Sequence, residues 1–204
     1  MKTKKKILTV LAIVGCAILL VAGSIAGTVA YLTATDSVTN TFTVGNVSIT
    51  LDESDASSAD PATAPRVKAN TYHLVPNGTY DKDPTIHLAA KSDACYLFVK
   101  VVNNIQGAEK SGATSVANQM AANNWVALAG EENVYVYTVS GSSVVATSDS
   151  VQDFVVFEHI TIDAEIENTA LAAYQNKTIE VTAYAVQAAG FASAADAWDA
   201  TFGA

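Results

Sequence analysis

Residues 95–102, CYLFVKVV, form the stretch of this 204-residue chain that decides the fold. Cys95, Leu97, Val99 and Val101 alternate along it, so they would share one face of a β-strand. The segment therefore predicts a buried strand. Because a free cysteine is usually a small core residue, Cys95 is interpreted as packed rather than reactive.

Outward from this stretch, the same alternation recurs between turn signals rich in Gly, Asn, Asp and Ser. Short helices are expected in the connections, at 115–122, 168–174 and from Ser193 to about Trp198. We therefore predict an all-β fold, an antiparallel β-sandwich of jelly-roll type, while an immunoglobulin-like topology stays open. The strands expected around residues 95–102 are 41–51, 72–74, 85–89, 134–139, 154–166 and 177–187.

The stretch 41–51, TFTVGNVSITL, changes the parity of its apolar residues at Gly45 and Asn46. Phe42 and Val44 precede this change, and an apolar set of opposite parity follows it. Such a change requires a bulge or a hinge, so the segment before Gly45 is expected to move independently of the strand after it. Residues 52–70, which are rich in Ser, Asp, Ala and Pro, are expected to form an exposed loop that contributes no core.

The N-terminus has the pattern of a secretory signal peptide. Lysines 2, 4, 5 and 6 precede an apolar run at 7–21, and mostly small residues follow up to Ala30. We predict a signal-peptide helix in residues 1–30, cleaved after Thr28-Val29-Ala30, and a mature extracellular domain from Tyr31 to residue 204. The alternatives are an uncleaved membrane anchor and a lipoprotein acylated at Cys16.

Composition restricts the partners of the mature domain. The whole chain carries a formal net charge of −9. From residue 31 onward seven basic residues stand against twenty acidic ones, which leaves −13. Such a surface repels nucleic acid and anionic lipid, so neither is expected as a partner, and the membrane is contacted only through the signal segment. Cys95 is the single cysteine after cleavage, so no intramolecular disulfide is expected.

Catalytic and metal-binding motifs are not recognised. His73, His87 and His159 are widely spaced, and no H-E-x-x-H, G-x-S-x-G, phosphate-binding or dinucleotide-binding motif occurs. Glu158 and His159 are neighbours on a strand and would point to opposite faces. The acidic run 52–55 lacks an EF-hand spacing and is interpreted as solvated. We therefore expect no enzyme activity, no catalytic or metal residues and no cofactor.

Four stretches carry a family resemblance: GTVAYL at 27–32, NTFTVGNV at 40–47, LVPNGTYDKDP at 74–84, and the strand at 95–101. Together they resemble the TasA/camelysin family of exported proteins with SipW-type signal peptides. The resemblance implies a jelly-roll-like exported protein of Gram-positive bacteria, located at the cell surface or in the biofilm matrix. It also implies self-association into fibres or association with other matrix proteins, after processing by a signal peptidase.

A mechanism of assembly follows from the residues and this resemblance together. Residues 31–45 would be a donor strand that augments the sheet of another subunit, with Phe42 and Val44 filling an acceptor groove and Gly45 and Asn46 forming the hinge. Pairing of 41–51 within its own sheet is the alternative, giving a monomeric surface adhesin that binds through the loop 52–70 or a strip of Tyr135, Tyr137 and Tyr184. A camelysin-like metalloprotease is the remaining alternative.

Overall fold

The structure, a computed structural model, describes residues 45–58, 60 and 63–203. Its strands form antiparallel sheets with few, short helices, so the all-β prediction is confirmed. The first sheet has the order β2-β1-β4-β9. Its strands are β1 (Ile49–Ser54), β2 (Arg66–Val67), β4 (Thr85–Leu88) and β9 (Gln152–Val155).

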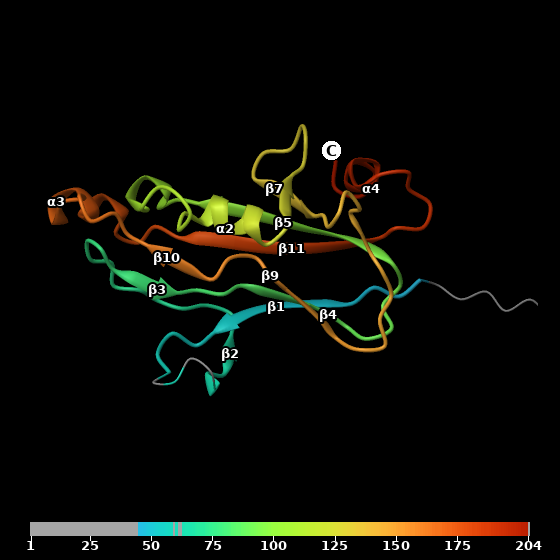
Figure 1. Cartoon of the computed structure of the whole chain (residues 1–204), viewed down its shortest axis with the longest axis horizontal. Helices are drawn as coiled ribbons and strands as arrows, with labels where there is room; N and C mark the ends of the chain where they lie inside the picture. The colour runs from blue at the N-terminus through green and yellow to red at the C-terminus, as the bar shows by residue number, and fades with distance from the viewer. Residues whose placement is uncertain (1–44, 59, 61–62, 204) are drawn as a thin grey trace, which may run out of the picture. The chain divides into compact units, whose positions relative to one another are not determined.

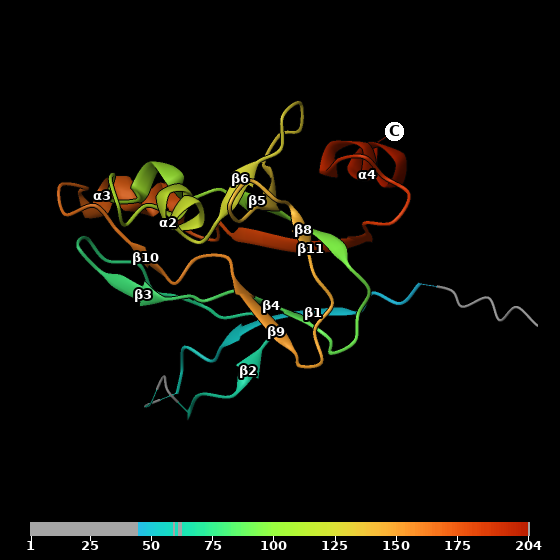
Figure 2. The same cartoon turned by 45° about the vertical axis from the view of Figure 1, so that its right-hand side comes forward.

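The second sheet is built around β5 and has the order β11-β5-β7-β6, with β8 also pairing to β5. Its strands are β5 (Cys95–Asn103), β6 (Trp125–Ala127), β7 (Val134–Tyr137), β8 (Val144–Val145) and β11 (Ile179–Gln187). A two-stranded sheet pairs β3 (Thr79–Asp81) with β10 (His159–Thr161). Figures 1 and 2 show the two larger sheets as separate layers.

The main core lies between these layers. Alternate residues of β5, including Leu97 and Val99, pack there with Ile86 of β4 and Phe154 of β9. The opposite face of β5 is also covered, because Phe98 packs with Trp198 of helix α4 (Ala194–Thr201) in a second cluster. The prediction of a buried strand at 95–102 is therefore confirmed, and Cys95 is fully buried.

Helices lie at the three positions where they were expected, although no side chain caps the middle one. Ser115 caps α2 (Val116–Ala122) and Ser193 caps α4, each through its side-chain oxygen. The predicted helix at 168–174 is α3 (Asn168–Leu171) followed by the 3-10 turn η3 (Ala172–Tyr174), and a second 3-10 turn, η2, spans Gln106–Ala108. Within the described part of the chain, none of these helices has the length and apolarity needed to cross a bilayer.

Three expectations about strands and loops were wrong. The segment 154–166 is divided between β9 and β10, which belong to different sheets. Residues 72–74 belong to no strand among the described residues. The region 52–70 is not wholly an exposed loop, because it contains the end of β1, the strand β2 and a buried carboxylate, Glu53.

Candidate functional site

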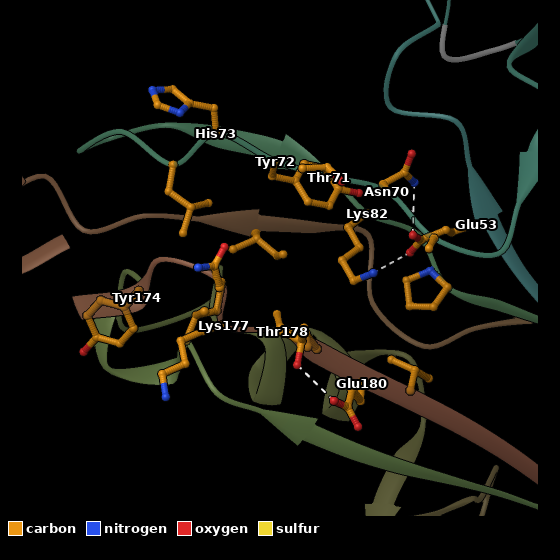
Figure 3. A pocket seen from close by; sticks show the side chains of 18 of the residues that line it. Glu53, Asn70, Thr71, Tyr72, His73, Lys82, Tyr174, Lys177, Thr178 and Glu180 are labelled. Atoms are coloured by element: carbon orange, nitrogen blue, oxygen red, sulfur yellow. Dashed lines mark hydrogen bonds and ion pairs between the residues drawn. The ribbon is translucent and has the colours of Figure 1, made fainter. Parts of the chain in front are cut away.

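A groove of about 1130 Å³ opens beside β11 (Figure 3). One wall is the start of β11, and the other is the segment 68–75, which belongs to no strand. All four residues from Ile179 to Thr182 line the groove, although their side chains alternate between the two faces of the sheet. The groove therefore follows the edge of β11 rather than one face of it.

The edge of β11 that borders the groove has unpaired backbone groups. β11 pairs with β5 along its whole length, and its other side pairs with no strand of the described chain. The N–H of Asn104 donates to the carbonyl of Thr178, and that of Ala188 donates to Ala94. The even-numbered residues of β11 thus point their N–H and C=O groups toward β5. Ile179 and Val181 point theirs away from β5, toward the groove.

The opposite wall is a segment held mainly by side chains. The hydroxyl of Tyr80 donates to the carbonyl of His73 and accepts from the N–H of Val75, at 2.7 Å each. The ammonium of Lys68 donates to the carbonyl of Leu51, at 2.5 Å, and so covers the outer edge of β1. An incoming strand would therefore meet β11 as the available edge.

The floor of the groove is apolar. Leu51, Leu74 and Val181 are partly buried and pack against the main core, and Ile105, Ile160 and Leu171 belong to that core. An apolar slot beside an unpaired strand edge has the features that β-augmentation uses: backbone groups for hydrogen bonds and pockets for alternate side chains.

At one end of the groove lies a buried polar cluster. The Lys82 ammonium binds Glu53 Oε2 at 2.5 Å, and the side-chain amide of Asn70 donates to Glu53 Oε1 at 3.0 Å. The ring of Tyr72 lies beside them, with Lys82 Nζ 6.0 Å from its centroid. Burial, with the nearby negative charge of Glu53, raises the pKa of the Tyr72 phenol, which therefore stays protonated.

A second polar network crosses the outer face of the first sheet. Arg66 bridges Asp52 and Asp83 at 2.7 and 2.6 Å. His87 lies between Asp52 and Asp153 at 2.9 and 2.6 Å. Burial alone would lower the pKa of His87, but hydrogen bonds to Asp153 and Asp52 raise it. Burial alone would raise the pKa of Asp52, but hydrogen bonds from Arg66 and His87 lower it.

These networks account for two carboxylates of the acidic run 52–55. Asp52 pairs with Arg66 and His87, and Glu53 pairs with Lys82. No group of three or more His, Cys, Asp or Glu side chains in the described ranges is arranged to hold a metal ion.

Most of the residues that the sequence singles out for processing and donation, namely Thr28, Ala30, Tyr31, Phe42 and Val44, lie outside the described residues, as does the signal segment. Gly45 and Asn46 lie within them. The N–H of Asn46 donates to Asp93 Oδ2 at 2.9 Å, and its carbonyl accepts from the N–H of Asp93 at 2.8 Å. The chain is thus anchored from Asn46 onward, and any hinge lies at or before Gly45.

The three tyrosines do not form a single exposed strip. Tyr135 and Tyr137 pack against the main core, whereas Tyr184 contacts Trp198 and Phe202 at the other face of the sheet. The cluster of Glu53, Asn70 and Lys82 was missed, because two of its members fall in a polar stretch that resembles a loop. Two of its members had been singled out separately, Glu53 in the acidic run 52–55 and Lys82 in the stretch 74–84, but nothing in the sequence joined them.

Comparisons of the chain with protein-family models, with curated proteins and with solved structures found no match. The role of the groove is therefore inferred from its geometry and chemistry.

Proposed function

We propose that this chain is an exported structural protein of jelly-roll type that forms fibres at the surface or in the biofilm matrix of a Gram-positive bacterium, as the TasA/camelysin resemblance implies. It is not an enzyme in this proposal. Cleavage before Tyr31 releases an N-terminal strand, which inserts into the groove of the next copy. The observation that carries the proposal is the groove along the unpaired edge of β11, with the apolar side chains that line its floor.

The N-terminal segment has the chemistry that this groove requires. Phe42 and Val44 alternate with threonines, so in an extended strand both point to one side, toward the apolar floor. Asp36 is the single charged side chain between residues 31 and 44, so insertion of this segment buries little charge. The backbone groups of Ile179 and Val181 would continue the ladder into the inserted strand.

Chain reach favours insertion into a second copy. Gly45 lies against the side chain of Gln187, at the far end of β11 from the groove. Thr182 lies five positions before Gln187 in β11, a distance of about 17 Å. Phe42 is three residues from Gly45 and reaches about 10 Å at most. Phe42 and Val44 of one chain thus fall short of its own groove, and donation between copies propagates head to tail without closing.

A mixing experiment tests this proposal with two assembly-incompetent variants. The first begins at residue 45 and has no donor. The second keeps the donor strand but carries Val181→Lys, which places a charged side chain in the acceptor groove. Each should remain monomeric alone, and an equimolar mixture should form dimers but not fibres, as read by size-exclusion chromatography and negative-stain electron microscopy.

The matched control is Val126→Lys, which makes the same substitution at an exposed valine of β6, outside the groove. This control should form fibres like the unmodified mature protein, and thermal unfolding should show that both lysine variants fold. Fibres from Val181→Lys, or failure of the two variants to dimerise, would refute donation into this groove.

The monomeric binding module has one observation in its favour. Asn70, Tyr72, Tyr174 and Asn176 line the same groove, and amide and aromatic side chains of this kind suit a carbohydrate. A mature protein that stays monomeric, with glycan binding that Val181→Lys abolishes, would move the assignment to this function.

A further inference from the structure

Three side chains from separate segments meet at the end of the groove (Figure 3). Glu53 comes from β1, Asn70 follows β2, and Lys82 follows β3. One carboxylate joins the other two: Glu53 Oε2 accepts from Lys82 Nζ at 2.5 Å, and Oε1 accepts from Asn70 Nδ2 at 3.0 Å. An amine and an amide thus share a single acid–base group.

Two of the three side chains are largely withdrawn from solvent. The Glu53 side chain is 6% exposed and that of Lys82 is 11% exposed, and Tyr72 flanks the ammonium. Every other lysine in the described ranges is exposed. The ammonium and the carboxylate lie 2.5 Å apart, so a proton can pass between them without any rearrangement of the chain. The resulting neutral amine is a nucleophile.

The amide of Asn70 is held by hydrogen bonds at both its oxygen and its nitrogen. Its carbonyl oxygen accepts a hydrogen bond from the N–H of Ala56 at 2.9 Å, which would stabilise negative charge developing on that oxygen. Its nitrogen also donates to the carbonyl of Ser54, at 2.8 Å. The leaving nitrogen therefore lies beside Glu53, on the same carboxylate that binds the nucleophile.

We propose that Lys82 and Asn70 join in an intramolecular amide bond, with Glu53 as the proton carrier. Glu53 takes a proton from the Lys82 ammonium, and the free amine attacks Cγ of Asn70. The tetrahedral centre collapses as Glu53 returns its proton to Nδ2. The C–Nδ2 bond breaks, ammonia leaves, and it takes up the second proton that Lys82 releases. One Lys–Asn amide and one ammonium ion are the products, and no oxidant or cofactor is consumed.

The cross-link would supply what the chain otherwise lacks. Segment 68–75 belongs to no strand of the described chain, and the lone cysteine of the mature part allows no internal disulfide. An Asn70–Lys82 bond ties this segment to the connection between β3 and β4 and closes a loop in the unfolded chain.

Mass spectrometry of the purified mature protein tests the proposal. The intact mass should be lower than the sequence mass by one ammonia. Trypsin should fail to cleave after Lys82, so residues 69–91 should appear as one looped peptide that lacks ammonia. Glu53→Gln, which keeps the shape but cannot carry the proton, and Lys82→Arg should both show the full sequence mass, with thermal unfolding confirming that they are folded.

Two results would overturn the proposal. One is a wild-type protein with the unmodified sequence mass. The other is ammonia loss with normal cleavage after Lys82, which indicates cyclisation of an asparagine with its own backbone. Because neither readout depends on fibre formation, failure of this proposal and failure of strand donation are distinguishable.

Discussion

Raising the pH from about 6 to about 8.5 should destabilise the domain through His87. Its two ring nitrogens face Asp153 and Asp52 at 2.6 and 2.9 Å. An imidazolium donates to both carboxylates, whereas a neutral ring can donate to only one. Deprotonation therefore breaks a link that joins β1, β4 and β9 across the outer face of the sheet.

The expected size follows from the exposure of each partner. The Asp153 side chain is 60% exposed, so its bond contributes about 0–1 kcal/mol. The Asp52 side chain is 18% exposed, but its charge also pairs with Arg66 and stays paired when His87 is neutral. The His87–Asp52 bond is therefore expected to contribute about 1 kcal/mol. Because deprotonation removes only one of the two bonds, the free energy of unfolding should fall by about 1 kcal/mol.

The direction follows from the raised pKa of His87. The folded-state pKa lies above the ordinary value of 6.5, so the contribution is fully present below that value and is lost as the pH rises through the folded-state pKa. Urea unfolding of wild type and His87→Gln across this range measures it. His87→Gln should be less stable at the acidic end, and the two profiles should converge at the alkaline end. An equal decline in both proteins would refute the assignment to His87.

Two further predictions concern single residues. Burial raises the pKa of the Cys95 thiol to about 11, so a maleimide at about pH 8 should label the native protein far more slowly than the urea-unfolded protein, and equal rates would contradict the packed position. The Ser193 hydroxyl accepts from the N–H of Asp196 at 3.2 Å, so Ser193→Ala should lower the free energy of unfolding by about 1 kcal/mol, whereas Ser193→Asp, which keeps a capping oxygen, should not.

Local patterns were sufficient where local chemistry decides the structure. Ser193 predicted the start of α4, because a capping hydroxyl satisfies a backbone donor within three residues of itself. The cap expected at Asn168 was wrong, since Asn168 is the first residue of α3. β5 was predicted because a strand covered on both faces is nearly continuously apolar.

Patterns failed where the chain passes from one sheet to another. Val156 and Phe157 are adjacent and both fully buried, because they lie between β9 in one sheet and β10 in another. In the sequence they simply continue an apolar run. The segment 72–74 shows the same limit, since alternation predicts an extended backbone but does not say whether a neighbouring strand is present to pair with it.

The Glu53–Asn70–Lys82 cluster depends on pairing that no local pattern encodes. Glu53 meets Asn70 because β1 turns back through β2, with Glu53 opposite Val67. Lys82 reaches the same carboxylate from beyond β3, a strand of a different sheet. Yet this cluster lies at the end of the groove, and Asn70 belongs to the wall that has no strand partner. A covalent bond there would fix the wall before any strand arrives, so an incoming donor would not have to order it. The two proposals are thus physically linked although they are tested separately: one supplies a rigid acceptor, and the other supplies the strand that fills it.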